Sequence, residues 1–146
     1  MKKVAIMLSL GLLTSTSVWA KEITPETLIG RYKAEAKVAF TRYYLNMRVQ
    51  DQNEFEIQRV YPDGRKDELC NGKFTIGPSL FRRDMVVFAG KSFRGTFTCP
   101  SDRSKTLNFN INFGDKKVED LEKGTSVIVT TSAAPGMRLN TYVKKL

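Results

Sequence analysis

The sequence predicts an all-β protein, an antiparallel up-and-down barrel of about 8 to 9 strands. Apolar and polar residues alternate with period two along most of the chain. Turn-forming residues interrupt this alternation at intervals of about 8 to 12 residues, as in antiparallel meanders. No long amphipathic helix is available to connect parallel strands. A two-sheet sandwich has the same strand pattern and remains the alternative.

The first twenty residues have the organisation of an export signal. Lys2 and Lys3 precede an apolar run over residues 4–13, and Val-Trp-Ala at 18–20 suits signal peptidase. The run is shorter than the roughly 20 residues that span a bilayer. We therefore predict a signal peptide over 1–20, one mature domain over 21–146, and a periplasmic or secreted location without a transmembrane segment. A retained N-terminal anchor is the alternative.

The mature chain is expected to begin with a short helical turn over residues 23–28. Thr24 is a good helix cap, Pro25 suits the first helical position, and the non-acidic Thr27 leaves the capping box partial. Alternation then predicts strands over 32–40, 43–49 and 54–61. Polar residues at 51–53 and the Pro-Asp-Gly sequence at 62–64 predict the turns between them.

The second half continues the same pattern. We expect strands over residues 68–76, 80–88, 93–99, 107–113, 127–130 and 137–146, with turns or loops at 77–79, 90–92, 100–104, 114–116 and 135–136. The alternation slips near residues 82–84, which predicts a bulge in that strand. Residues 118–123 are a connecting segment without a clear pattern.

The two cysteines, Cys70 and Cys99, both lie in the mature part. In an oxidising compartment such a pair predicts a disulfide, whose loop of roughly 30 residues contributes about 3.5 kcal/mol. Two free buried thiols are the alternative. Two cysteines without any histidine do not complete a zinc site, so no metal is expected.

The chain contains no histidine. This excludes the usual Ser-His-Asp and Cys-His catalytic arrangements. No glycine-rich phosphate loop is present either. We therefore predict a protein that is not an enzyme and that carries no cofactor; a carboxylate pair in a barrel mouth is the weaker alternative.

The chain is basic, with a formal net charge of +9 that falls by two when Lys2 and Lys3 leave with the signal. Arg82, Arg83, Lys91 and Arg94 are candidates for a basic patch. Such a patch would attract an anionic glycan, a lipid head group or an acidic protein. A solvated strand edge that discourages aggregation is the alternative. No nucleic-acid partner is expected, because lysines and aromatic residues do not cluster on one identifiable face.

Three sequence features resemble those of bacterial lipocalin-like secreted barrels of the calycin type. Gly30-x-Tyr32 follows the apolar Leu28-Ile29, much as lipocalins enter their first strand through Gly-x-Trp after an apolar turn. Cys70-x-Gly72-x-Phe74 and the terminal stretch 124–146 are similar to segments of such barrels. The resemblance implies an up-and-down barrel that holds a small lipophilic molecule.

Apolar residues that share the inward parity are the candidates for lining the barrel: Tyr32, Phe40, Met47, Phe55, Phe74, Phe97, Phe109 and Phe113. An interior rich in aromatic rings and methionine suits an apolar ligand. In the alternative, the same residues fill the core. The protein then acts through its surface, as a binding module or an inhibitor.

Overall fold

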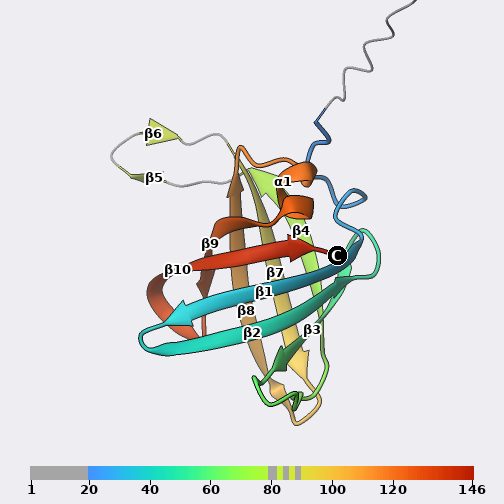
Figure 1. The fold of residues 1–146 in the computed structure, drawn as a ribbon, viewed down its shortest axis with the longest axis vertical. Helices are drawn as coiled ribbons and strands as arrows, with labels where there is room; N and C mark the ends of the chain where they lie inside the picture. The colour runs from blue at the N-terminus through green and yellow to red at the C-terminus, as the bar shows by residue number, and fades with distance from the viewer. Residues whose placement is uncertain (1–19, 79–81, 84–85, 88–89) are drawn as a thin grey trace, which may run out of the picture.

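Eight antiparallel strands form a closed barrel in the computed structural model, which describes residues 20–78, 82–83, 86–87 and 90–146 (Figure 1). The barrel strands are β1 (Gly30–Val38), β2 (Thr41–Val49), β3 (Glu54–Val60), β4 (Cys70–Pro78), β7 (Lys91–Cys99), β8 (Asp102–Gly114), β9 (Thr125–Thr131) and β10 (Ala134–Lys145). One short helix, α1 (Val118–Lys123), precedes β9. Residues 1–19, which hold most of the predicted signal peptide, lie outside the described residues.

Each barrel strand pairs with its neighbour along the chain, and β1 also pairs with β10, which closes the sheet. Tyr32 shows both pairings, because it lies opposite Met47 on β2 and opposite Lys145 on β10. A closed sheet has no free edge for another chain to pair with. The predicted up-and-down barrel is confirmed, and the sandwich alternative is wrong.

The strand expected over residues 80–88 is wrong. Two strands of two residues, β5 (Arg82–Arg83) and β6 (Val86–Val87), pair only with each other and stand apart from the barrel (Figure 1). The reason is that β4 pairs directly with β7, where Pro78 lies opposite Lys91. β5 and β6 therefore have no neighbour in the barrel sheet. Part of the predicted bulge, at residue 84, lies outside the described residues.

Several predicted turns are displaced. Residues 91–92 belong to β7, and β8 already begins at Asp102. The last turn falls at residues 132–133, whereas 135–136 lie within β10, at a register shift where Gly136 has a φ of +75°. The first strand ends at Val38, because Ala39 adopts a φ of +54° in the hairpin that follows. Residues 118–123 form α1, whose Asp120 accepts a hydrogen bond from the Lys117 backbone at 2.8 Å.

The predicted helical turn near the N-terminus is present and covers one end of the barrel. Thr24 and Thr27 cap each other, since each hydroxyl accepts the other residue's backbone N–H, at 3.2 and 2.8 Å. A threonine therefore takes the place that glutamate usually holds in a capping box. Apolar side chains of this turn and of α1 are buried over the barrel: Ile23, Leu28, Val118 and Leu121. We call this the closed end.

No helix among the described residues has the length and apolar character needed to cross a membrane.

Two glutamates at the closed end make stability depend on pH. Glu22 accepts a hydrogen bond from the Lys117 ammonium, which lowers the pKa of its carboxyl. Glu119 accepts the backbone N–H of Lys21 at 3.0 and 3.2 Å, which lowers its pKa as well. A carboxyl whose pKa is depressed in the folded state contributes stability above its unfolded pKa, and this is lost as the pH falls through the folded value.

We expect the thermal midpoint to fall as the pH is lowered below the ordinary glutamate value of 4.5. In the double variant Glu22→Gln/Glu119→Gln the same decrease should be shallower, because neither side chain titrates. Differential scanning calorimetry across this range measures both slopes. Glu26→Gln is the control, since Glu26 forms no ion pair among the described residues. Equal slopes for the double variant and the unaltered protein would contradict the prediction.

Candidate functional site

A cluster of phenylalanine rings fills the interior toward the closed end. Phe55 is fully buried at its centre, with ring centroids 5.4 to 6.4 Å from four others: Phe74, Phe93, Phe97 and Phe109. All four rings meet Phe55 edge to face, which is a favourable arrangement for aromatic rings. Gly72 makes room for this packing, because a Cβ there would lie 2.6 Å from the Phe55 ring. This half of the barrel is a solid core.

The other half contains a cavity of about 350 Å³. The side chains that line it are almost all apolar and come from strands on every side, including Ala34, Ala36, Leu45, Met47, Val129 and Leu139. The cavity is hollow because β1 contributes two alanines where other strands contribute large side chains. It extends to the hairpins that connect β1 to β2 and β9 to β10, since Val38 and Ala133 also line it. We call this end the mouth.

Three polar groups in the cavity wall already have hydrogen-bond partners within the protein. Thr131 donates its hydroxyl to the Asn108 carbonyl at 3.1 Å, and Thr141 donates to the Leu139 carbonyl at 3.3 Å. The hydroxyl of Tyr32 donates to the Leu28 carbonyl at 2.6 Å. Burial, together with the nearby charge of Glu122, raises the pKa of Tyr32, so this phenol stays protonated as a donor. The cavity therefore offers a ligand an apolar wall and few unused polar groups.

Tyr32 also joins the cavity to the closed end. Its ring is 2% exposed and lies beneath Lys145, whose ammonium is 6.0 Å from the ring centroid. The same ammonium donates to the Thr27 carbonyl at 2.9 Å. The last strand and the N-terminal turn thus meet over Tyr32 and hold this end shut.

The predicted lining residues divide into three groups. Tyr32, Met47, Phe97 and Phe109 line the cavity. Phe55, Phe74 and Phe113 are buried in the core cluster and do not line it. The placement of Phe40 in the interior is wrong: it is 99% exposed, because β1 ends at Val38 and the following turn directs it outward.

The sequence analysis missed the small cavity-lining residues. Ala34 and Ala36 share the parity of Tyr32, and both lie on the inner face of β1. An eight-stranded barrel has an interior that side chains can just fill, so two small residues in succession on an inner face leave space there.

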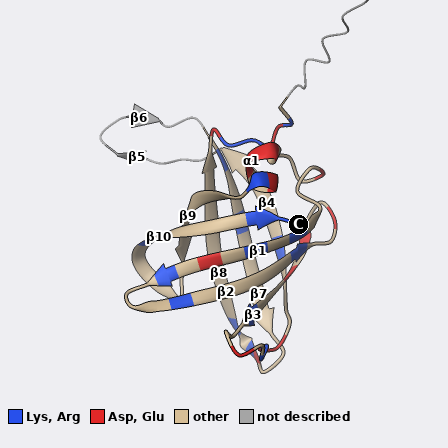
Figure 2. Cartoon of the chain, viewed as in Figure 1, with Lys and Arg blue, Asp and Glu red and all other residues tan. Residues whose placement is uncertain are grey.

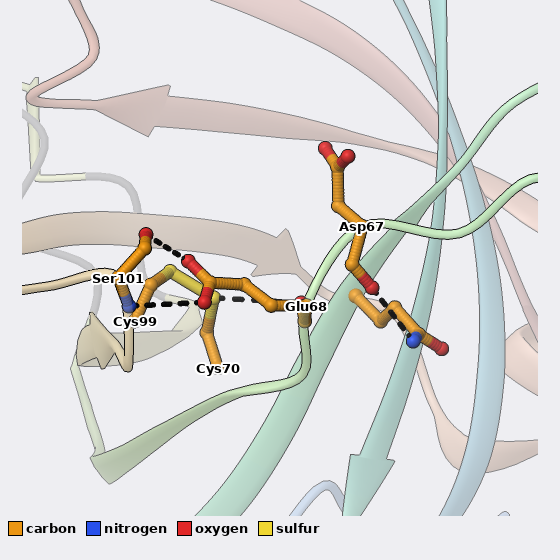
Figure 3. Close-up of a disulfide and its surroundings, with 6 residues drawn as sticks. Asp67, Glu68, Cys70, Cys99 and Ser101 are labelled. Atoms are coloured by element: carbon orange, nitrogen blue, oxygen red, sulfur yellow. Dashed lines mark hydrogen bonds between the residues drawn. A yellow bond between two sulfur atoms is a disulfide. The ribbon is translucent and has the colours of Figure 1, made fainter.

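The predicted disulfide is present at the mouth. Cys70 at the start of β4 and Cys99 at the end of β7 are bonded, with their Cα atoms 4.4 Å apart. Beside them, Glu68 accepts hydrogen bonds from the backbone N–H of Ser101, at 3.0 Å, and from its hydroxyl (Figure 3). Both links tie the connection between β3 and β4 to the hairpin between β7 and β8. Glu68 also lies near the two sulfur atoms, but these are bonded to each other and so are not thiolate ligands for a metal.

The structure describes only part of the predicted basic patch. Lys91 donates to the Ile23 carbonyl at 2.9 Å, and its ammonium is 3.9 Å from Glu22. Arg94 donates to the Pro78 carbonyl at 3.2 Å. The backbones of Arg82 and Arg83 form β5, but their side chains lie outside the described part of the chain. Figure 2 shows lysines and arginines on β1, β2 and β10, together with an acidic segment on β1.

Comparisons of the chain with protein-family models, with curated proteins and with solved structures found no significant match.

Proposed function

We propose that this chain is an exported binding protein that holds a small lipophilic molecule inside its barrel. The observation that carries the proposal is the apolar cavity of about 350 Å³ between the phenylalanine core and the mouth. Ligand sites in proteins occupy about 300 to 1,000 Å³ and are lined mainly by apolar side chains. An interior hollow of this kind, in an eight-stranded antiparallel barrel, supports a lipocalin-like function.

The physical basis is the removal of apolar surface from water. A ligand in the cavity would contact Leu45, Met47 and Leu139 without leaving any buried polar group unpaired, because the threonine hydroxyls are already bonded to carbonyls. Burial contributes roughly 25 cal/mol for each Å² of apolar surface removed from water. Such a site distinguishes ligands by size and shape more than by hydrogen bonding.

We further propose that the protein works outside the cytoplasm after cleavage behind Ala20. The disulfide supports this location, because such bonds persist in oxidising compartments. The position of Lys21 supports the cleavage, since its backbone nitrogen already lies against the Glu119 carboxylate. Cleavage would convert that nitrogen into an ammonium group and add an ion pair at the closed end. The intact mass of the purified protein reports the cleavage position.

Filling the cavity should weaken ligand binding. We expect Ala36→Phe to weaken uptake of a fluorescent fatty acid by at least about tenfold, because the new ring occupies the space between β1 and the opposite wall. Lys37→Phe is the matched control: it puts the same ring on the exposed outer face of the same strand. Fluorescence titration of both variants measures the effect. Equal affinities for the two variants would contradict binding in the cavity.

Native mass spectrometry of the protein, purified without detergent from the compartment to which it is exported, tests the proposal directly. Added mass that is lost on denaturation supports a natural ligand. A bare polypeptide that also takes up no fluorescent fatty acid overturns the proposal.

A further inference from the structure

We propose that Arg59 binds the anionic head group of an amphipathic ligand whose hydrocarbon part occupies the cavity. The inference rests on the proposed function and names the chemical class of its ligand. That class is a single-chain molecule with a terminal carboxylate.

A second hollow at the mouth places Arg59 beside the cavity. It has a volume of about 420 Å³ and lies between β3, the connection to β4, and the disulfide. Three apolar side chains, Leu45, Ile57 and Phe97, line both this hollow and the cavity. A chain lying across these three side chains would therefore pass from the cavity directly into the hollow that Arg59 lines.

The Arg59 guanidinium lies over two aromatic rings. Its central carbon is 4.5 Å from the ring centroid of Tyr43 and 4.5 Å from that of Tyr61. Tyr43 also lines the cavity, so this stack forms part of the mouth. Stacking covers the two faces of a guanidinium, but its N–H donors point outward in the plane and match a carboxylate. The two rings restrict the Arg59 side chain, and its N–H groups form no hydrogen bond among the described residues.

Arg59 has no ion pair or side-chain hydrogen bond among the described residues. The nearby arginines differ in this respect, because Arg42 pairs with Glu35 at 3.2 Å and Arg65 pairs with Asp63 at 2.6 Å. Arg59 is half-buried, and a guanidinium in that setting gains from a charge-assisted partner.

The carboxylates of the same hollow are turned to other partners. Asp67 accepts a hydrogen bond from the Tyr61 hydroxyl at 3.0 Å, and Glu68 accepts two from Ser101. The backbone of Asp67 donates to the Arg59 carbonyl at 3.0 Å, which fixes this loop against β3. Both acids keep their negative charge, but neither lies within ion-pair distance of Arg59. The Arg59 guanidinium therefore still has N–H donors that can meet a carboxylate in this hollow.

The division between the two hollows indicates an amphipathic ligand. The cavity has an apolar wall and contains no charged side chain, so a carboxylate inside it would be desolvated without a partner. At the mouth the same carboxylate would meet Arg59 while its chain remained buried. A ligand of this class satisfies both regions at once.

Isothermal titration calorimetry with dodecanoate and with dodecanol tests the assignment, because the two probes share a chain and differ in charge. We expect the unaltered protein to bind dodecanoate about ten- to a hundredfold more tightly than dodecanol. Arg59→Met should remove this preference by weakening dodecanoate binding much more than dodecanol binding, since methionine keeps an apolar stem and loses the charge. Arg65→Met is the matched control: this exposed arginine also lies over the Tyr61 ring, at 5.0 Å, and should leave the preference intact.

Each outcome decides the proposal. Equal affinities of the unaltered protein for the two probes, or an unchanged preference in Arg59→Met, overturn the role of Arg59 and leave the cavity function standing. Binding of neither probe overturns the carrier function itself. If Arg59→Met does not fold, the salt dependence of the unaltered protein decides: added salt should weaken dodecanoate binding more than dodecanol binding, and equal weakening overturns the head-group site.

Discussion

Replacing Phe55 by alanine is expected to lower the free energy of unfolding by about 3 to 5 kcal/mol, the range found for deleting a buried phenylalanine ring. Phe55 is 0% exposed and lies at the centre of the aromatic core. Its removal would expose a void to the rings of Phe93 and Phe109, whose centroids are 5.5 and 5.4 Å away. The four rings packed against Phe55 limit how far the site can collapse. Denaturant unfolding, followed by near-ultraviolet circular dichroism, measures the loss.

Phe40→Ala is the matched control, because it deletes the same ring from a position that is 99% exposed. We expect its stability to stay within about 0.5 kcal/mol of the unaltered protein. A loss at Phe40 as large as that at Phe55 would contradict the placement of the β1–β2 hairpin. A small loss at Phe55 would contradict the solid core at the closed end.

Removing the disulfide is expected to cost a similar amount. The double variant Cys70→Ser/Cys99→Ser should lose about 3.5 kcal/mol, because the bond closes a loop with a sequence separation of 29 in the unfolded chain. The loss has a local consequence as well. The connection between β3 and β4 is tied to the β7–β8 hairpin by this bond and by Glu68, so amide hydrogen exchange over residues 61–69 should accelerate.

Ser101→Ala tests the Glu68 contact independently of the disulfide, since it keeps the disulfide and removes only the hydroxyl donor to Glu68. We expect it to change global stability by less than about 1 kcal/mol, because the contact is exposed. If the double cysteine variant were as stable as the unaltered protein, the disulfide would not constrain the unfolded chain as the loop-entropy model requires.

Both the barrel and its disulfide could be predicted from residue patterns. The alternation from Leu107 to Phe113 specifies a strand because side-chain direction in a strand repeats every two residues. Cys70 and Cys99 were paired by simple count, since the chain contains two cysteines. The sequence predicted only a partial capping box at Thr24, because Thr27 is not acidic. In the structure the Thr27 hydroxyl accepts the Thr24 backbone N–H that a glutamate usually binds, so the box is complete.

The predictions for residues 80–88 and for Phe40 were wrong because the local alternation of residues there does not match the observed pairing of strands. A strand was expected over residues 80–88, but β4 and β7 pair with each other, and β5 and β6 pair only with each other. Phe40 is an even number of residues from the inward-facing Tyr32, which predicts an inward side chain. The strand ends before Phe40, however, because Ala39 forms part of the hairpin turn, and Phe40 is therefore exposed. Pairing partners and hairpin positions depend on contacts between distant residues, which periodicity does not contain.

The sequence by itself determined the class of fold and which face of most strands is buried, because both follow from the two-residue repeat of a strand. The tertiary structure alone decided which inward side chains fill the barrel and which surround empty space. Phe55 and Ala36 share the inner surface, but one lies among four rings and the other beside a cavity. The position of Arg59 between Tyr43 and Tyr61 was decided in the same way. The interior volume and the stacking of side chains across strands depend on how several strands are aligned with one another. The sequence pattern of a single strand does not specify that alignment.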